Sequence, residues 1–337
     1  MITELIKKLL SGGKITVHET KTTFEDIMDG KISPVLTSAF LTALRFSGET
    51  PEEIYAAALV LRERATPVSF HRDIIADIVG TGGDYKGTFN ISTASAILSS
   101  ACGVHIAKHG NRSISSHCGS ADILESLGME IKIPAGKAAQ MLENFNFTFL
   151  FAPLYHPAMK QIAGVRKELG FKTIFNVLGP MCNPAKANVL LVGVSDSRLF
   201  EIIPEILLRF GVKRAWVCFG EDGIDEITLT DKTYIADVTD RIERFEIKPE
   251  DFGMKRCLLK DIAGTTASEN AEILKRILSS QEKGPKKNII LLNTASLLYI
   301  SGQVLNVTDG IEVADKSIKS GRAFANLEKI IKFSHDN

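Results

Sequence analysis

The chain has 337 residues, 45% of them hydrophobic, and its 40 basic residues balance 40 acidic ones to a net charge of zero. This length exceeds what one hydrophobic core usually supports, so we expect one large domain and one smaller domain. The neutral charge argues against nucleic-acid binding, the most apolar stretch (Asn288–Ile300) is too short to span a membrane, and the start MITELIKKLLSGGK lacks a signal-peptide core, so we expect a soluble cytoplasmic protein.

The first 70 residues predict helices only. Helical periodicity indicates three helices, at Ile2–Leu10, Phe24–Met28 and Pro34–Phe46. The segment TPEEIYAAALVLRERA predicts a fourth, with Thr50 as N-cap, Pro51 at the first helical position and Glu53 closing a capping box. Residues 34–44 are more apolar than a small bundle needs. They are suited either to core packing or to contact with a partner helix.

From Ile74 onward, short apolar stretches alternate with helical ones. The predicted strands are Ile75–Val79, Val104–Ala107, Glu130–Ile133, Thr148–Phe151, Val189–Val194 and Ala215–Phe219. The helices between them are expected at Thr93–Ala101, Ala121–Leu127, Gly136–Asn144 and Arg198–Phe210, with Pro204 kinking or interrupting the last. This alternation is typical of an α/β fold in which helices cover both faces of a mostly parallel sheet.

The last third of the chain departs from this alternation. Two stretches, Thr233–Ile235 and Ile242–Ile247, predict additional antiparallel strands. Helices then continue to Lys332, beginning with one capped by Ser268. We therefore expect a small N-terminal helical domain (1–70) and a large α/β domain (71–337).

Three polar loops follow predicted strands. The first is VGTGGD, which includes Gly80, Gly83 and Asp84; the second is GTFNISTAS, with hydroxyl and amide side chains before a helix; the third is KHGNRSISSHCGSAD, residues 108–122. Small residues and helix N-termini let backbone N–H groups converge on an anion. Each loop alone has an ordinary explanation, as a glycine turn or as helix capping by Ser92 or Thr93. Three such loops between residues 80 and 122 indicate a ligand with more than one phosphate.

Two further segments carry charged side chains suited to a ligand. EDGIDEI, residues 221–227, places Asp225 and Glu226 side by side after a strand. Such a turn is either simply solvated or, beside a polyphosphate, a site for Mg²⁺. YHPAMKQIAGVRKELG predicts a helix from Pro157, on which Arg166 is either a surface residue or a ligand for a planar carboxylate.

The five cysteines indicate neither disulfides nor zinc. They are scattered, odd in number and form no CxxC pair. Cys118 lies in the third polar loop, but its neighbour His117 gives no sign of the geometry that a nucleophilic cysteine needs. We expect Cys118 to be a small buried residue or a loop residue without a catalytic role.

Taken together, the motifs resemble the anthranilate phosphoribosyltransferase family over nearly the whole chain. The matching segments are GTGGD, NISTAS, KHGNR, GSAD, HPAM…VRKELG, TIFNVLGP, NP, DE and NIILLNTA. The resemblance implies transfer of the 5-phosphoribosyl group from phosphoribosyl pyrophosphate to the amine of anthranilate, in tryptophan biosynthesis. It also implies dependence on Mg²⁺, helices around 160–185 that join the helical domain, and a homodimer formed through that domain.

The resemblance also implies roles for individual residues. Contacts with phosphoribosyl pyrophosphate are expected from Gly80, Gly83, Asp84, Thr88, Asn90, Ile91, Ser92, Thr93, Lys108, His109, Gly110, Asn111, Arg112, Ser113, Ile114, Ser115, Ser116 and Ser120. Mg²⁺ is expected on Ser92, Asp225 and Glu226, and anthranilate on Gly80, Asn111 and Arg166. No protein nucleophile is needed, and His109 is expected to position the amine or assist its proton loss. Ser113 and His117 depart from the usual family pattern, but neither change removes a matched ligand group.

Two other functions remain as alternatives. A pyrimidine nucleoside phosphorylase has a similar Thr-Gly-Gly turn, but a Lys-His-Ser run would precede it, where this chain has Ala76–Val79. A non-catalytic, nucleic-acid-binding paralogue would show a basic surplus and would lack the anthranilate positions. This chain is neutral and retains Asn111 and Arg166.

Overall fold

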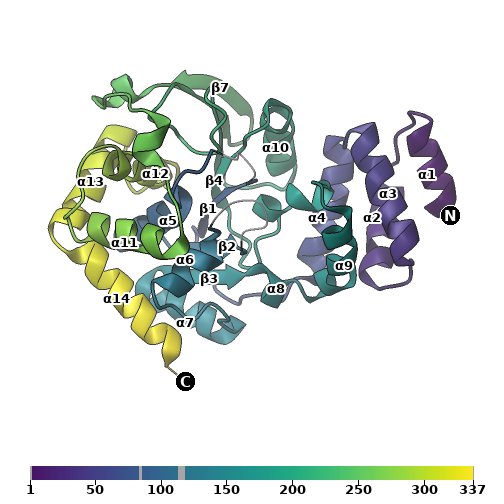
Figure 1. Ribbon diagram of the computed structural model, residues 1–337, viewed down its shortest axis with the longest axis horizontal. Coiled ribbons are helices and arrows are strands. Elements are labelled where there is room, and N and C mark those ends of the chain that lie inside the picture. Colours follow the sequence, from purple (N-terminus) through teal and green to yellow (C-terminus); the bar gives the residue numbers. More distant parts are fainter. Residues whose placement is uncertain (1, 83–85, 113–117, 337) are drawn as a thin grey trace.

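The computed structural model describes residues 2–82, 86–112 and 118–336. Its N-terminal helices pack at one end of the molecule, at the right in Figure 1. They are α1 (Ile2–Leu10), α2 (Val17–Met28), α3 (Pro34–Ser47) and α4 (Pro51–Arg64). The predicted capping box of Thr50 and Glu53 is confirmed. The prediction for α2 was too short, because a second capping box, formed by Thr16 and Glu19, starts that helix well before Phe24.

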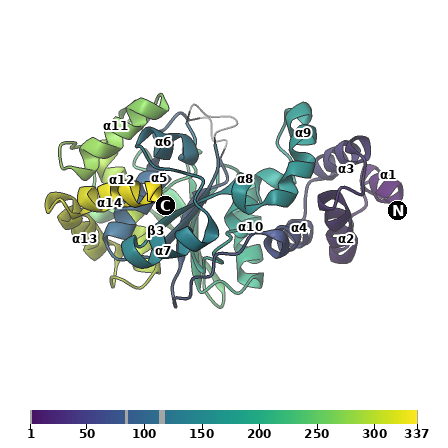
Figure 2. The ribbon, with the colours of Figure 1, turned by 90° about the horizontal axis from the view of Figure 1, so that it is seen from below.

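A helix from the middle of the chain completes this bundle. α9 (Lys160–Leu169) packs against α2 and α3, and both views place it at the helical end (Figures 1 and 2). The 3₁₀ turn η2 (Ile174–Asn176) follows, and its Phe175 ring lies 5.4 Å from the ring of Phe24. The predicted start at Pro157 was wrong. Residues Pro157–Met159 form a separate 3₁₀ turn (η1) after the short helix α8 (Ala152–Tyr155).

The rest of the chain is built on one seven-stranded sheet, with strand order β3-β2-β1-β4-β5-β6-β7. The strands are β1 (Ala76–Gly80), β2 (Ile106–Gly110), β3 (Phe147–Phe151), β4 (Val189–Gly193), β5 (Arg214–Gly220), β6 (Thr233–Val238) and β7 (Ile242–Ile247). The first five strands in chain order pair in parallel, whereas β6 and β7 pair antiparallel. This confirms the mostly parallel sheet and its antiparallel extension.

Helices cover both faces of the sheet, as the two views show (Figures 1 and 2). One face is covered by α5 (Ile91–Ala101) and α12 (Pro285–Ile300), with α11 (Ala267–Leu278), α13 (Val307–Lys319) and α14 (Arg322–His335) outside them. α10 (Ser197–Arg209) packs on the other face and against α4. It continues through Pro204 without the predicted interruption, since that proline is buried within one continuous helix. Two shorter helices, α6 (Ser120–Ser126) and α7 (Ala135–Phe145), lie near the β3 edge.

Three local predictions need correction. Glu130–Ile133 is not a strand, because side chains take its backbone bonds: Tyr155 Oη donates to Ile133 O at 2.8 Å and Glu130 N donates to Ser334 Oγ at 3.0 Å. α11 is capped by Thr266 rather than Ser268. β2 starts and ends later than predicted, because its pairing with β3 continues as far as Gly110 opposite Phe151. None of the described helices is long and apolar enough to cross a lipid bilayer.

Candidate active site

A cavity of about 690 Å³ lies where the carboxyl ends of the parallel strands face the helical end of the molecule. Its walls come from both parts: the loops after β1, β2 and β5, and segments of α8, α9 and η2. It brings together every predicted site residue that the structure describes, namely Gly80, Thr88, Asn90, Ile91, Ser92, Thr93, Lys108, His109, Gly110, Asn111, Arg112, Ser120, Arg166, Asp225 and Glu226. The other predicted residues, Gly83, Asp84, Ser113, Ile114, Ser115, Ser116 and also His117, lie outside the described part of the chain.

The N-terminus of α5 forms one wall. α5 begins at Ile91, so Ser92 and Thr93 lie in its first turn and do not cap it, contrary to the capping alternative. The preceding Asn90 is held by its side chain, which donates to Cys118 O at 3.0 Å and accepts from Asn270 Nδ2 at 3.0 Å. The first-turn N–H groups of a helix lack intrahelical acceptors, so this wall offers donors to an anion.

The acidic pair lies between the two strand-end loops. Asp225 Oδ2 accepts from the N–H of Gly82 at 3.0 Å, and Glu226 Oε1 accepts from the N–H of Ser92 at 3.0 Å. Asp225 is also packed tightly against two strand-end glycines. A Cβ on Gly80 would lie 2.3 Å from Asp225 Oδ2, and one on Gly193 would lie 1.6 Å from the Asp225 carbonyl oxygen. Both carboxylates are therefore held at the strand-end loops by backbone donors of those loops.

The loop that carries the acidic pair is fixed from the inside by a buried amide. Asn293 of α12 accepts from the N–H of Ile227 at 3.1 Å and donates to its carbonyl at 2.8 Å. Ile227 directly follows Glu226, so both backbone groups beside the pair are anchored to the core. Asn293 is fully buried in the apolar helix α12, and these hydrogen bonds satisfy its amide there.

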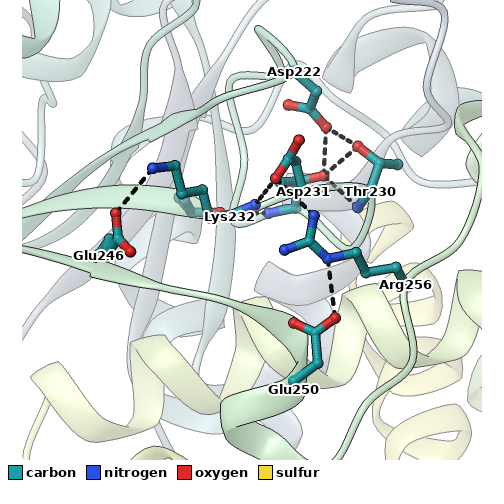
Figure 3. A network of polar contacts seen from close by, with 9 residues as sticks. Asp222, Thr230, Asp231, Lys232, Glu246, Glu250 and Arg256 are labelled. Atoms are coloured by element: carbon teal, nitrogen blue, oxygen red, sulfur yellow. Dashed lines mark hydrogen bonds and ion pairs between the residues drawn. The ribbon is translucent and has the colours of Figure 1, made fainter.

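The same loop is fixed from the outside by the network in Figure 3. Asp222 accepts from the hydroxyls of Thr228, at 2.7 Å, and of Thr230. Arg256 bridges Asp231 and Glu250 at 2.8 and 3.0 Å. Because both ends of the loop are tied down, the positions of the two carboxylates are determined before any ligand binds.

Replacing Gly193 by Ala is expected to lower the free energy of unfolding by about 1–3 kcal/mol and to shift the acidic pair, since the new methyl group overlaps a backbone carbonyl. Gly136→Ala is the matched control. Gly136 lies in α7, where an added Cβ would meet nothing within 4 Å, so Ala there should stabilise by up to about 1 kcal/mol. Urea unfolding measures both. A Gly193→Ala protein as stable as the wild type would contradict the close packing.

Lys108 is a buried cation at the base of the cavity. Its ammonium donates to the carbonyl of Ile78 at 2.7 Å and to Ser92 Oγ at 3.4 Å. Burial lowers the pKa of Lys108, and the nearby carboxylates of Asp77, Glu226 and Asp225 oppose that shift. The ammonium thus lies between the β1 loop and the first turn of α5, where a phosphate would contact both.

Next to it, His109 is neutral and has a defined tautomer. Burial and the neighbouring His156, whose ring centroid is 5.0 Å away, lower the pKa of His109 to about 3. Nδ1 lies 3.1 Å from the carbonyl of Gly179, which can only accept, so Nδ1 carries the proton. Nε2 is then a lone-pair acceptor, and it has no hydrogen-bond partner among the described residues. Because Nε2 is also buried from solvent, His109 contributes the shape of the cavity wall and not an open acceptor.

Acid should destabilise the fold through this histidine. The folded-state pKa of His109, about 3, is below its ordinary value of 6.5. Between these values the unfolded chain binds the extra proton, so stability is lost as pH falls below about 6.5. From about pH 6.5 to pH 5 the loss is about 2 kcal/mol for His109, and it should be absent in His109→Gln. Urea unfolding at both pH values, with the exposed His18→Gln as control, checks this. An unchanged pH slope in His109→Gln would contradict it.

The two arginines that line the cavity, Arg166 and Arg112, differ in their side-chain partners. Arg166 is half-buried in α9, and burial lowers its pKa. Its guanidinium lies 5.7 Å from the Phe175 ring, and within the described residues no carboxylate pairs with it. Arg112 instead binds Asp122 at 3.1 Å and Glu125 at 2.7 Å. Of the two arginines, Arg166 is the one suited to a carboxylate ligand.

Several residues that line the cavity were missed from the sequence. They are Lys160, Lys172, Asn176, Gly264, Thr265 and Asn270. His156, in the segment YHPAMKQIAGVRKELG, also lines the cavity and was given no role. Gly264 approaches so closely that a Cβ there would lie 2.5 Å from Phe89 Cα, and Asn270 orients Asn90. Lys160 and Asn176 lie inside the quoted segments YHPAMKQIAGVRKELG and TIFNVLGP but were given no role, whereas Lys172, Gly264, Thr265 and Asn270 come to the site from positions outside every quoted motif. Cys118 is buried with a raised pKa, as expected of a structural thiol.

The donors at the acidic pair fit Mg²⁺ in kind. Ser92, Asp225 and Glu226 offer only hard oxygen ligands, and all three line the same cavity. Among the described residues, no three His, Cys, Asp or Glu side chains cluster to hold a metal by themselves. Mg²⁺ is bound by few carboxylates and completes its shell with water and phosphate oxygens. The donor set is thus suited to a magnesium ion that arrives with a phosphate ligand.

Two family profiles together match most of the chain. Residues 72–324 match "Glycosyl transferase family, a/b domain", and residues 3–65 match "Glycosyl transferase family, helical bundle domain". The chain is 47% identical over 336 residues to an anthranilate phosphoribosyltransferase of Methanobrevibacter smithii, covering 99% of this chain and 100% of that protein. A protein of the same name from Petrotoga mobilis is 45% identical, with 99% and 97% covered.

Solved structures agree with the sequence relatives. The anthranilate phosphoribosyltransferase of Thermus thermophilus superposes with a TM-score of 0.92 at 38% identity, covering 98% of this chain and 99% of that one. The enzyme of Saccharomyces cerevisiae, in complex with PRPP and Mg, superposes with a TM-score of 0.91 at 30% identity, covering 99% and 97%. The likeness therefore extends through both the helical bundle and the α/β part.

Proposed function

Because this chain belongs to the anthranilate phosphoribosyltransferase family, we propose that the cavity between its sheet and its helical bundle is the site of that reaction. The enzyme transfers the 5-phosphoribosyl group from phosphoribosyl pyrophosphate to the amine of anthranilate and releases pyrophosphate, in tryptophan biosynthesis. The observation that carries the site assignment is that one cavity holds two strand-end loops, an acidic pair and Arg166.

The two substrates would occupy different walls. Phosphoribosyl pyrophosphate is suited to the loops after β1 and β2 and to the first turn of α5, where N–H groups and Lys108 offer donors. Anthranilate is suited to the α9 side, where Arg166 can bind its carboxylate through a planar fork. Asn111 and Gly80 line the space between these walls.

We propose that Ser92, Asp225 and Glu226 hold Mg²⁺ when phosphoribosyl pyrophosphate binds. The bound ion would supply positive charge to the departing pyrophosphate. Lys108 adds a positive charge from the protein in the same region, 3.4 Å from Ser92 Oγ. A charge that is already in place favours departure of the pyrophosphate because it needs no rearrangement as the negative charge develops.

His109 would position the attacking amine. Its ring lines the cavity and is held by the bond from Nδ1 to the Gly179 carbonyl, while Nε2 is buried, so it would act through the shape of the wall against which the amine lies. A histidine with a pKa of about 3 is a weak base, so positioning contributes more than proton removal. The cavity contains no thiolate that would serve as a nucleophile, since burial raises the pKa values of its Cys118 and Cys182.

A direct assay tests the function. Anthranilate should disappear, and pyrophosphate should appear in equal amount, only when phosphoribosyl pyrophosphate and Mg²⁺ are both present. Supplying thymidine and phosphate in place of both substrates, and measuring released thymine, tests the phosphorylase alternative. A duplex-DNA shift assay tests the nucleic-acid alternative. Neither alternative is favoured by the relatives named above. No consumption of anthranilate by folded protein would overturn the proposal.

We also propose a division into a helical domain, formed by residues 1–70 and helices around 160–185, and an α/β domain formed by the rest, acting together in the cytoplasm. The packing of α9 against α2 and α3 supports the assignment of residues 160–185 to the helical domain. Between the two parts, the Tyr55 ring of α4 packs at a tilt against Phe210, with 4.7 Å between the ring centroids, and Glu49 pairs with Arg198 at 3.2 Å. Closure of the cavity would need these contacts to adjust.

We propose a homodimer through the helical domain. α3 presents an exposed stripe on one face, with Val35 77% exposed and Phe46 81% exposed, and Ala39 and Thr42 between them at helical spacing. Phe40 and Leu44 lie on the opposite side, fully buried in the core. They are therefore unsuited to a dimer contact, and changing them would unfold the domain instead.

Replacing Val35 and Phe46 together by Glu is expected to give a folded monomer. Both side chains already face solvent, so the fold tolerates the change, whereas an interface that buries two unpaired charges loses several kcal/mol. Light scattering measures the mass, and circular dichroism confirms the fold. Leu305→Glu, at an equally exposed position far from α3, is the control and should leave the mass unchanged. A dimer that survives the double change would place the interface elsewhere.

A further inference from the structure

The sheet is split between β1 and β2, two neighbouring strands whose carboxyl ends line the cavity. β1 pairs with β4 over five residues, from Ala76 opposite Val189 to Gly80 opposite Gly193. Against β2, by contrast, only Ala76 opposite Ile106 is in register within these two fully described strands. The next rung of a parallel ladder would join Ile78 to Lys108. It is missing.

Side chains satisfy three of the four backbone groups that this rung would have paired. Ala107 O accepts from Asn183 Nδ2 at 2.7 Å, and His109 N donates to Asp77 Oδ2 at 3.3 Å. Ile78 O accepts from Lys108 Nζ at 2.7 Å. At these three groups the backbone partner has been exchanged for a side chain.

Asp77 and Asn183 are the two members of this arrangement that touch each other without facing the cavity. Asn183 Nδ2 donates to Asp77 Oδ2 at 2.8 Å as well as to Ala107 O. Asp77 is fully buried and Asn183 is 6% exposed. A buried acid and amide are costly to desolvate, so their presence in the core of a sheet calls for a compensating role.

Asn183 also brings the segment that returns from the helical bundle into the split. This segment follows η3 (Gly179–Met181), whose Gly179 carbonyl accepts from His109. On its other side Arg62 of α4 donates to Met181 O at 3.2 Å. The segment thus contacts the helical end, the split and His109 in turn.

We propose that Asp77 and Asn183 form a positioning unit for the transfer reaction. The unit keeps the ends of β1 and β2 apart at the separation that phosphoribosyl pyrophosphate needs, and it thereby places Lys108 and His109 at the edge of the cavity. This inference rests on the proposed function. Neither residue lines the cavity, so both act through the strand ends that they hold. Without them the rung between Ile78 and Lys108 is free to close, which would carry both cavity side chains away from their places.

The test compares two asparagines that bond β1 in similar ways. Asn183 lies at the split, whereas Asn188 accepts from Ile75 N at 3.0 Å and donates to Asp73 O at 2.9 Å, at the start of β1 away from the cavity. Both Asn183→Ala and Asn188→Ala should lower the melting temperature. Only Asn183→Ala should lower kcat/KM for phosphoribosyl pyrophosphate, by roughly 100-fold, the effect of a misplacement of about 1 Å. Equal kcat/KM losses in the two variants would overturn the proposal.

A second pair keeps the test decisive if Asn183→Ala does not fold. Asp77→Asn retains an oxygen that can accept from His109 N and Asn183, whereas Asp77→Ala retains none. Positioning predicts that Asp77→Asn recovers most of the kcat lost in Asp77→Ala. Equal kcat losses in Asp77→Asn and Asp77→Ala would mean that the hydrogen bonds that hold the split open do not determine turnover, and would overturn the proposal.

Binding without turnover separates this inference from the proposed function. Calorimetric titration with Mg²⁺ and inorganic pyrophosphate should show weaker binding to Asn183→Ala than to Asn188→Ala, and a crystal structure of Asn183→Ala should show Ile78 N closer to Ala107 O. If the wild type fails to turn over but this difference appears, the proposed function is wrong and the positioning unit stands. Equal binding and an unchanged split would reject the positioning unit whatever the activity.

Discussion

Replacing Asp225 by Asn together with Glu226 by Gln is expected to reduce kcat by at least about 100-fold, because a metal ion at a departing phosphate supplies several kcal/mol and each 1.4 kcal/mol is a factor of ten. The fold should survive. The new amides keep an oxygen that can accept from Gly82 N and Ser92 N, as the carboxylates do. What they lose is the charge that attracts Mg²⁺.

The measurement is kcat as a function of Mg²⁺, with calorimetric binding of phosphoribosyl pyrophosphate in the presence and absence of the ion as a second readout. Asp240→Asn with Glu243→Gln removes two exposed carboxylates near β7 and serves as a charge-matched control. It should behave like the wild type. Wild-type kcat of the Asp225/Glu226 variant at limiting Mg²⁺ would show that the ion is held elsewhere.

Arg166→Ala should raise the KM for anthranilate by about 10- to 100-fold, since a charge-assisted bond to a carboxylate is worth about 1.5–3 kcal/mol. The KM for phosphoribosyl pyrophosphate should change little, because that substrate is assigned to the opposite wall. Arg166→Lys should recover only part of the loss, since an ammonium lacks the planar fork. The guanidinium is half-buried beside Phe175, so its removal also costs some packing.

Steady-state kinetics with each substrate varied in turn distinguishes binding from packing. Lys167→Ala, next along α9 and exposed, is the control and should leave both KM values unchanged. A parallel rise in both KM values would make Arg166 a structural residue. No change in either would move the anthranilate pocket away from α9.

The sequence predicted the parts of this site that are continuous in the chain. Glycine-rich and hydroxyl-rich turns after apolar strands placed Gly80, Ser92 and Lys108 near one another, and an acidic turn after a strand placed Asp225 with them. These predictions succeeded because parallel strands end at a common edge. The capping box at Thr50 was read correctly because its signal spans only four residues.

What the sequence did not predict depends on residues distant in the chain. Nothing in the sequence near Asp77 indicates that the side chain of Asn183 will take a backbone partner of the next strand. Likewise, nothing near Ile227 indicates that Asn293 will bond its backbone. Glu130–Ile133 has the composition of a strand, yet Tyr155 and Ser334 take its backbone bonds. Local propensity and periodicity contain no information on which side chain arrives from elsewhere.

The completion of the bundle by α9 has a consequence for synthesis on the ribosome. α2 and α3 leave the ribosome long before α9 and η2, so the apolar face that Phe24 offers to Phe175 stays uncovered while the intervening strands are made. Closing so long a loop is also entropically slow compared with pairing neighbouring helices. The nascent helical bundle is therefore the part of this chain most exposed to aggregation, and the part for which a chaperone has most to protect.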